Sequence, residues 1–298
     1  MKVYLGKEMK KKRRLIILLL FIVILAGYIS ASLYMSTNSL VVNNIQLESS
    51  KLSKNQSVRC VVLADLHDHE FGTDNKELIA KVNAQSPDII LLAGDFINDI
   101  SENSEIVCTV VEALCDIAPT YFAMGNHELA YLEKHPELVD EIEASGAVIV
   151  EKSYVDTEVD GVSLCIGGIY DYAFFLAERE DLEPDRQESK EFLEDFQETD
   201  AVKIMLSHRP DSFCFNDAST DWDVDLVVSA HNHGGQVVVP FLGGLYGGDQ
   251  GWFPEYVHGM YELGDMHMYV TNGLGSDKKV LPRFNNRPEI AVIEISGK

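Results

Sequence analysis

The chain has 298 residues, of which 46% are hydrophobic, enough to bury the core of one large domain or two small ones. Its formal net charge of −24 is divided unevenly: the first 14 residues carry seven bases and one acid, which leaves 17 basic and 47 acidic residues downstream, a net of −30. A surface this acidic repels nucleic-acid phosphates, which excludes general DNA or RNA binding. To bind a phosphorylated substrate, the protein would need metal cations that offset its own negative electrostatic potential.

The first predicted element is a transmembrane helix at residues 15–35, a run of 21 positions without charge that is long enough to cross a bilayer. The basic tail, residues 1–14, directly precedes it. Under the positive-inside rule this places the N-terminus in the cytoplasm and the rest of the chain outside. A cleaved signal peptide is the alternative, since Ser30-Ala31-Ser32 offers small residues to a peptidase. We expect an uncleaved single-pass anchor, because the apolar run exceeds a usual signal-peptide core.

A polar segment rich in Ser and Asn, residues 36–56, is predicted to be a stalk, which leaves residues 57–298 as the folded domain. Five short apolar runs in this domain have the length and the Val, Ile and Leu content of buried strands: residues 58–64, 89–93, 121–124, 202–206 and 226–228. Helical patterns lie between the early runs, with apolar residues at spacings of three and four. Alternation of strands and helices indicates an α/β fold.

Polar residues able to bind metals follow each of the five predicted strands. The five strand exits read Asp65-Leu66-His67, Gly94-Asp95, Gly125-Asn126-His127-Glu128, Ser207-His208 and His231-Asn232-His233. Because ligands bind outside the carboxyl ends of strands in α/β sheets, we expect these side chains to converge on one point. Any one of them has an ordinary explanation, such as capping a turn, but coincidence is a poor explanation for all five.

This set of oxygen and imidazole donors contains no thiolate, so it suits divalent ions such as Mn, Fe or Zn. Eight potential donors exceed what one tetrahedral ion uses, and they suffice for two ions that share a carboxylate. Two metals roughly 3.5–4 Å apart can activate a water between them and hold a phosphoryl group for in-line attack. The strand exits therefore predict a two-metal site for phosphoryl chemistry.

The series Asp65-x-His67, Gly94-Asp95, Gly125-Asn126-His127-Glu128, His208 and His231-x-His233 resembles the calcineurin-like metallophosphoesterase family over about residues 58–298. The resemblance implies a four-layer αββα sandwich of two mixed sheets flanked by helices, here preceded by the transmembrane helix. It also implies two metal positions. The first would be held by Asp65, His67 and His233, the second by Asn126, His208 and His231, with Asp95 bridging the two. His127 would protonate the leaving group or stabilise developing charge.

Two further features bear on this resemblance. The family's last motif usually begins with Gly, whereas Ala230 precedes His231 here, and alanine resists a positive φ. The turn must therefore use an ordinary backbone geometry or shift slightly. The segment that follows, with Gly234-Gly235-Gln236 and Gly251-Trp252-Phe253-Pro254, resembles a branch of membrane-associated phosphoesterases that includes diacylglucosamine pyrophosphatases.

Several other residues have candidate roles. Asp99 and Glu128 are expected to orient ligands, because metal-bound histidines commonly donate to a carboxylate. Asp171 is a candidate to line the cleft. A basic cluster faces either substrate phosphate or solvent and comprises Lys278, Lys279, Arg283 and Arg287. The apolar segment at residues 240–261 either packs on the core or faces the membrane.

The sequence therefore predicts a membrane-anchored metal-dependent phosphohydrolase that cleaves a phosphoester or pyrophosphate bond by in-line attack of a metal-bridging hydroxide. Two divalent ions (Mn, Fe or Zn) are its expected cofactors, and its expected substrate is a phosphorylated small molecule or a lipid-linked phosphate. The alternative is a catalytically silent metal-binding scaffold at the membrane. His127 beside a complete ligand set favours the enzyme, because a scaffold has no need of a proton donor.

Overall fold

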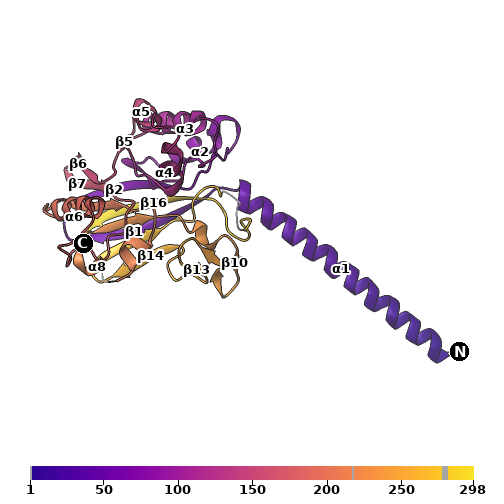
Figure 1. Ribbon diagram of the computed structural model, residues 1–298. Coiled ribbons are helices and arrows are strands. Elements are labelled where there is room, and N and C mark those ends of the chain that lie inside the picture. The colour runs from indigo at the N-terminus through magenta and orange to yellow at the C-terminus, as the bar shows by residue number, and fades with distance from the viewer. Residues whose placement is uncertain (1, 217, 277–280) are drawn as a thin grey trace.

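The computed structural model describes residues 2–216, 218–276 and 281–298. One long helix, α1 (Lys2–Asn38), leads into a domain built on two six-stranded mixed sheets. The sheets pack against each other, and helices cover the outer face of each (Figure 1). The predicted four-layer αββα fold behind an apolar N-terminal helix is therefore confirmed.

The first sheet has the order β1-β16-β2-β3-β4-β5, in which β16 runs antiparallel to β2 and the other pairs are parallel. Its strands are β1 (Val41–Ser49), β2 (Ser57–Leu63), β3 (Ile89–Leu92), β4 (Thr120–Phe122), β5 (Val148–Ile149) and β16 (Glu289–Gly297). The second sheet has the order β14-β15-β9-β8-β7-β6, with antiparallel pairs at its two edges and parallel pairs between them. Its strands are β6 (Ser153–Val159), β7 (Val162–Gly168), β8 (Val202–Leu206), β9 (Leu226–Ser229), β14 (Gly259–Leu263) and β15 (Met266–Val270).

Two groups of helices cover the sheets. On the first sheet lie α2 (Lys76–Asn83), α3 (Glu105–Cys115), α4 (Asn126–Leu132) and α5 (Leu138–Ala144). On the second lie α6 (Pro184–Phe196), α7 (Asp211–Cys214) and α8 (Ala218–Asp221). Two 3-10 turns are η1 (Thr73–Asn75) and η2 (His233–Gly235). Two small hairpins follow η2: β10 (Val238–Val239) with β11 (Gly243–Gly244), and β12 (Tyr246–Gly247) with β13 (Gly251–Trp252).

Apolar side chains fill three layers, one under each group of helices and one between the sheets. In β2, Cys60 and Val62 face the other sheet, whereas Val61 and Leu63 face the helices, as the alternation of side chains along a strand requires. Both faces of the central strands are therefore buried. This explains why these strands read as continuous apolar runs rather than as alternating patterns.

The five strands predicted from apolar runs correspond to β2, β3 and β4 of the first sheet and to β8 and β9 of the second. Their carboxyl ends meet where the two sheets face each other. His208, which follows β8, places its Nδ1 2.7 Å from the carbonyl oxygen of Ala93, which follows β3. The polar strand exits therefore gather at one seam between the sheets.

The stalk predicted at residues 36–56 is wrong. Val41–Ser49 forms β1, which pairs in parallel with β16 along its whole length. Leu47 and Leu52 from the same segment are buried in the layer between the sheets. An edge strand with one solvated face needs few apolar residues, so the Ser and Asn content concealed it.

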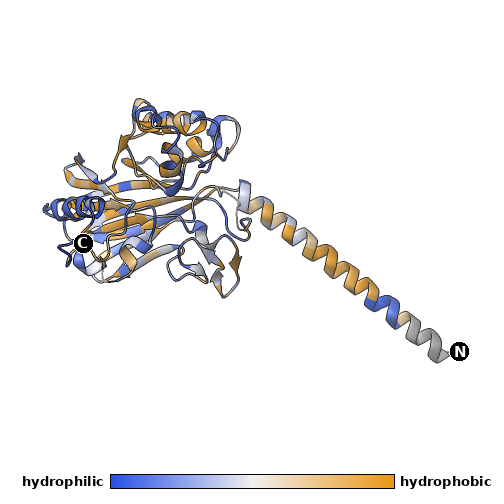
Figure 2. Ribbon diagram, viewed as in Figure 1, coloured by the Kyte–Doolittle hydropathy of each residue, from blue (hydrophilic) through white to orange (hydrophobic). Residues whose placement is uncertain are grey.

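Helix α1 contains the predicted transmembrane segment and extends past both of its ends. Within the described ranges it is the one helix long and apolar enough to cross a membrane. Its large apolar side chains project away from the domain: Phe21 is 60% exposed and Ile24 is 70% exposed. Figure 2 shows this apolar stretch of α1 standing clear of the domain, next to the basic residues.

The C-terminal turns of α1 are packed on the loop that precedes β16. The hydroxyl groups of Tyr28 and Ser32 donate hydrogen bonds to Asn285 Oδ1, at 2.8 and 2.7 Å. The backbone N–H of Asn286 donates to Ser36 Oγ at 3.1 Å. Ser32 and Ser36 are buried by these contacts. The helix is therefore fixed to the domain rather than joined to it by a flexible linker.

The link between the two sheets depends on a close backbone approach at Gly168, the last residue of β7. A Cβ at this position would lie 2.0 Å from the carbonyl oxygen of Val150. We expect Gly168→Ala to lower the free energy of unfolding by about 1–3 kcal/mol, the usual cost of overpacking. Ser163→Ala, at an exposed position of the same strand, is the control and should change it by less than about 0.5 kcal/mol. Thermal unfolding of the detergent-solubilised chain measures both, and equal melting temperatures would contradict the close approach.

Candidate metal centre

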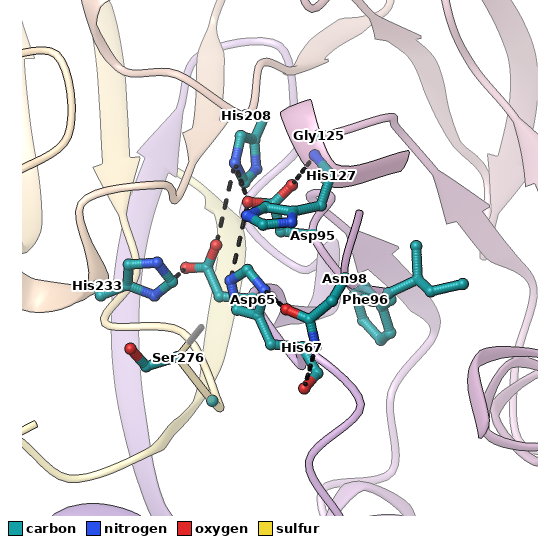
Figure 3. A network of polar contacts seen from close by, with 12 residues as sticks. Asp65, His67, Asp95, Phe96, Asn98, Gly125, His127, His208, His233 and Ser276 are labelled. Atoms are coloured by element: carbon teal, nitrogen blue, oxygen red, sulfur yellow. Dashed lines mark hydrogen bonds and ion pairs between the residues drawn. The ribbon is translucent and has the colours of Figure 1, made fainter. Parts of the chain in front are cut away.

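The side chains at the five strand exits converge on one buried cluster, as Figure 3 shows. Atoms able to bind a metal lie within 4.8 Å of one another in three groups. These groups are Asp65, His67 and His233; His67, Asp95 and His127; and Asp95, His208 and His231. Because His67 and Asp95 each belong to two groups, the three groups form one continuous cluster. The structure thus brings together residues from both sheets.

The turns that carry this cluster have strained backbone. Five of the residues adopt left-handed φ angles without being glycine: Asp65 (53°), His67 (49°), Asp95 (56°), His231 (64°) and His233 (45°). This conformation costs an L-residue up to about 1–2 kcal/mol, and such strain concentrates at functional sites. Ala230 is not left-handed, because the turn is made at His231 instead. Alanine in place of the family's usual glycine therefore keeps an ordinary backbone geometry.

Asp95 lies at the centre of the cluster. Its Oδ1 accepts a hydrogen bond from the backbone N–H of His127 at 2.9 Å, which fixes the orientation of the carboxylate. Its Oδ2 lies 3.1 Å from His208 Nε2 and 3.8 Å from His67 Nε2. Burial alone would raise the pKa of Asp95, but the facing histidines, His208 foremost, outweigh it and hold the pKa below its usual range. One carboxylate oxygen is thus placed between imidazoles from the two sheets.

Both of these imidazoles turn Nε2 toward Asp95, because each Nδ1 has another partner. His208 Nδ1 faces the Ala93 carbonyl oxygen, which can only accept, so Nδ1 carries the N–H. His67 Nδ1 lies 3.0 Å from Asn98 Oδ1, while Asn98 Nδ2 donates to the His67 carbonyl oxygen. Each Nε2 therefore points at a carboxylate, an arrangement that needs a proton or a metal cation between the two atoms. Burial opposes a charge on His208, but the Asp95 carboxylate outweighs it and raises the pKa of His208 to about 9. Histidine ligands of metals usually donate their other ring N–H to a protein oxygen in this way.

Asp65 is fully buried, and no described residue donates a hydrogen bond of normal geometry to either of its oxygens. Two histidine side chains face these oxygens: His233 Nδ1 lies 3.6 Å from Oδ2, and His208 Nε2 lies 4.0 Å from Oδ1. Burial raises the pKa of Asp65 to about 8 and lowers the pKa of His233 well below its usual value. A buried carboxylate without hydrogen bonds is costly unless a cation lies beside it. This side of the cluster therefore fits a divalent metal.

The other side of the cluster opens into a cavity of about 160 Å³, lined by Asn126, His127, His231 and His233 among others. Asn126 Oδ1 and His231 Nε2 are buried, and no described residue forms a hydrogen bond with either atom. Burial lowers the pKa of His231 to about 4, so its imidazole is neutral at pH 7. Amide oxygen and neutral imidazole are both ligands for divalent metals such as Mn, Fe and Zn. The donors on this side also fit a metal ion.

His127 is buried beside the cluster, with its ring 4.7 Å from that of His67 and edge-on to it. Its Nδ1 accepts a hydrogen bond from the backbone N–H of Asp99 at 3.1 Å and also lies 3.1 Å from Asp99 Oδ1. Asp99 was expected to orient a metal ligand. It contacts His127, the histidine predicted to transfer a proton.

Glu128 was expected to orient a ligand histidine. The structure shows that it holds the loop after β3 in place. Its buried carboxylate accepts hydrogen bonds from four backbone N–H groups: Asp95 (2.7 Å), Phe96 (2.6 Å), Ile97 (3.3 Å) and Gly125 (2.8 Å). Burial raises the pKa of Glu128 to about 7. The side chain joins two strand exits and supports the left-handed turn at Asp95.

Neither role predicted for Arg283, substrate phosphate recognition or solvation, is correct. Its guanidinium is buried and donates to the carbonyl oxygens of Asn272 at 2.8 Å and Gly275 at 2.9 Å. This loop closes over Asp65, since a Cβ on Gly273 would lie 2.3 Å from Asp65 Oδ2. Arg287 donates to Ser39, while Lys278 and Lys279 lie outside the described residues.

Asp171 was expected to line the cleft, but among the described residues it does not line the cavity. It pairs with Lys152 at 2.9 Å instead.

Arg209 lies near the cluster and was not predicted from the sequence. Its guanidinium lies 4.1 and 4.0 Å from the ring centres of Tyr170 and Tyr172. Tyr172 donates to Asp249, whose carboxylate lies 3.8 Å from His231 Nε2. The position of Arg209 directly after His208 was the available signal for a cation near the cluster.

The comparisons with known proteins agree with this geometry. The profile of the calcineurin-like phosphoesterase family matches residues 58–235, which contain every predicted metal ligand and His127. The uncharacterized metallophosphoesterase Cj0846 of Campylobacter jejuni is 32% identical over 91% of this chain and 67% of its own length. Phosphodiesterase YaeI of Escherichia coli is 28% identical over 80% of this chain and 82% of its own length. The uncharacterized metallophosphoesterase YkuE of Bacillus subtilis is also 28% identical, over 80% and 79%.

The family profile covers more than half of the chain, and the residues it covers form a buried cluster of metal-binding type. We conclude that this chain is a phosphoester hydrolase and belongs to the calcineurin-like phosphoesterase family.

Proposed function

We propose that the chain is a dinuclear metallohydrolase that cleaves phosphoester or pyrophosphate bonds at the outer face of a membrane. The observation that carries this proposal is the position of Asp95 Oδ2 between His67 Nε2 and His208 Nε2, at 3.8 and 3.1 Å. These two histidines belong to separate groups of metal-binding type, and Asp95 is a member of both groups. One shared carboxylate between two donor groups is what a two-metal site needs.

Each side of the cluster would hold one divalent ion, Mn, Fe or Zn. The first ion would be held by Asp65, His67, Asp95 and His233, and the second by Asp95, Asn126, His208 and His231. Bound at these positions, two ions supply Lewis-acid stabilisation of the phosphoryl group and lower the pKa of the attacking water. The protein's own contribution is to keep these donors buried and oriented, through the hydrogen bonds of Asn98, Ala93 and the His127 N–H.

His127 is the proposed general acid. Because the Asp99 N–H donates to Nδ1, the neutral ring carries its proton on Nε2. His127 also lines the cavity beside the cluster, where a leaving group can reach it. In the protonated ring, Nδ1–H faces the Asp99 carboxylate 3.1 Å away, and the Nε2 proton can pass to the leaving oxygen as its bond to phosphorus breaks, which leaves a neutral imidazole.

The proposed substrate is a phosphorylated small molecule or a lipid-linked phosphate, and the proposed location is the outer face of the cell membrane. The basic tail before α1 supports this orientation. An uncleaved anchor is supported by the hydrogen bonds of Tyr28 and Ser32 to Asn285, because cleavage at Ser30–Ser32 would remove Tyr28 from this contact. The net charge of −30 outside the tail supports the exclusion of nucleic acids.

The experiment that tests the proposal is an assay of the full chain in detergent with added Mn²⁺. Chromogenic phosphodiester, phosphomonoester and pyrophosphate substrates should be compared, each with and without chelator. We expect turnover of at least one substrate that stops on chelation. Absence of turnover with every divalent ion on all three classes would overturn the enzyme and leave the metal-binding scaffold.

The shared carboxylate gives the first prediction at this site. Asp95→Asn keeps the size of the side chain but removes its charge, so we expect both metal positions to weaken by about 10–100-fold or more. His67→Ala should mainly weaken one position. Elemental analysis of the purified variants measures this directly. Two tightly held metals per chain in Asp95→Asn would sink the assignment.

The second prediction concerns His127. We expect His127→Ala to keep its metals and to lose about 10²–10⁴-fold in turnover of substrates with poor leaving groups. The loss should be smaller for a nitrophenolate, which needs no proton. His135→Ala, at a partly exposed histidine outside the cavity, is the control and should retain full activity. An equal loss for good and poor leaving groups would show that His127 positions groups or stabilises charge instead.

A further inference from the structure

Four large apolar side chains stand exposed around the two hairpins that follow the last metal-binding motif. Their exposed fractions are 106% for Phe241, 69% for Leu242, 60% for Trp252 and 61% for Phe253, and we call these four residues the apolar tips. The sequence left open whether this segment packs on the core or faces a membrane. Tyr256 does pack on the core of the second sheet, but the apolar tips do not.

The apolar tips are unusual on this domain. Outside α1, the other large apolar side chains that the described domain exposes are Ile100, Val148 and Phe175, which lie on separate segments of the chain. Phe241 and Phe253 also have left-handed backbone, with φ angles of 69° and 58°, a costly conformation for a bulky residue. Clustered exposed apolar residues of this kind mark a surface that another phase or molecule covers.

The base of the first hairpin is tied to the loop that holds α1. Val238 N–H donates to the carbonyl oxygen of Phe284 at 2.9 Å, and Asn285 Nδ2 donates to that of Val238 at 3.3 Å. The same Asn285 accepts hydrogen bonds from Tyr28 and Ser32 of α1. The hairpin, the loop and the helix are therefore connected through one asparagine.

The length of α1 determines how deep the loop at Asn285 and the attached hairpin lie in the membrane. Charged residues at 10–14 stay in water, so the hydrocarbon begins near Leu15, and about 20 residues at 1.5 Å each reach its other boundary near Met35. Tyr28 lies about 10 Å before that boundary yet contacts Asn285. The loop and the attached hairpin therefore lie level with the outer leaflet of the bilayer. In Figure 1 the hairpins labelled β10 and β13 extend from the domain toward the side along which α1 runs.

We infer that the apolar tips insert into the outer leaflet of the same bilayer and form a second membrane contact beside α1. This inference rests on the proposed function only in that α1 spans the membrane. The occupant is lipid hydrocarbon rather than an anionic headgroup, because residues 234–261 contain no Lys or Arg. Trp and Phe are side chains that favour the membrane interface.

The contact would place the catalytic cavity at the lipid surface. Tyr246 and Gly248, from the second hairpin, line the cavity beside Asn126 and His231. The ring of Trp252 lies 5.4 Å from that of Tyr246, on the paired strand. One hairpin therefore contacts both the cavity and the proposed lipid surface, so a lipid-linked phosphate could enter without leaving the membrane.

Trp252 provides a direct test, because the chain has two tryptophans and the other, Trp222, is buried with its Nε1 bonded to the Ala173 carbonyl oxygen. Trp222→Phe leaves Trp252 as the reporter, and Trp252→Phe is the matched control that leaves Trp222. Both full-length variants are reconstituted into phosphatidylcholine vesicles with brominated or ordinary acyl chains. We expect brominated chains to lower Trp252 fluorescence roughly twofold and to leave Trp222 unchanged.

Flotation of the same vesicles separates the possible failures. Chains that do not float with lipid would overturn the membrane anchor itself. Chains that float while Trp252 is unaffected by brominated lipid would overturn the second contact and leave the anchor and the hydrolase intact. Should Trp222→Phe fail to fold, the unsubstituted chain measured against Trp252→Phe gives the Trp252 signal by difference.

A double substitution tests the contribution of the first hairpin. Phe241→Ser with Leu242→Ser should still float through α1, keep its melting temperature in detergent and lose most of the quenching of Trp252. A lower melting temperature with unchanged quenching would show that these two side chains support the domain and would remove them from the contact.

Discussion

Two buried carboxylates, Asp65 and Asp95, meet at the seam between the sheets, and the surrounding structure is organised to keep them there. A carboxylate inside a protein is stable only when opposite charge or hydrogen-bond donors replace the lost water. Asp95 has the backbone N–H of His127 and two facing histidines. Asp65 has no hydrogen bond of normal geometry from any described residue. The site therefore suits cations, and divalent metal ions would offset the charge of both carboxylates.

Keeping the donors in place requires strain that other interactions offset. The left-handed turns at Asp95 and His231 are unfavourable on their own. Glu128 stabilises the first by accepting hydrogen bonds from successive backbone N–H groups of that loop. Arg283 holds the loop above Asp65 through carbonyl oxygens, and Gly273 leaves room for the carboxylate beneath it. These side chains lie outside the predicted ligand set, yet the ligand geometry depends on them.

Helix α1 is part of the same architecture. Because β1 follows α1 almost directly and joins the first sheet, the chain has little freedom between this helix and the domain. Asn286 donates to the carbonyl oxygen of His233 at 2.5 Å and bonds Ser36 of α1 through its backbone. Asn286 therefore contacts both α1 and the loop that carries His233. The position of the cavity relative to α1 follows from these contacts rather than from the length of a flexible linker.

The sequence by itself determined the features whose physical signal is local. The central strands are buried on both faces, so they read as apolar runs, and the polar residues just after them marked the cluster from Asp65 to His233. The uncharged run in α1 indicated a helix able to cross a membrane. Only the tertiary structure decided the roles of β1, Glu128 and Arg283, because each is fixed by partners far along the chain or by backbone groups that have no sequence signature. In the sequence, β1 resembles a polar stalk, Arg283 a candidate phosphate ligand and Phe241 a residue of either the core or a membrane surface. The surrounding atoms, which only the folded structure shows, distinguish these possibilities.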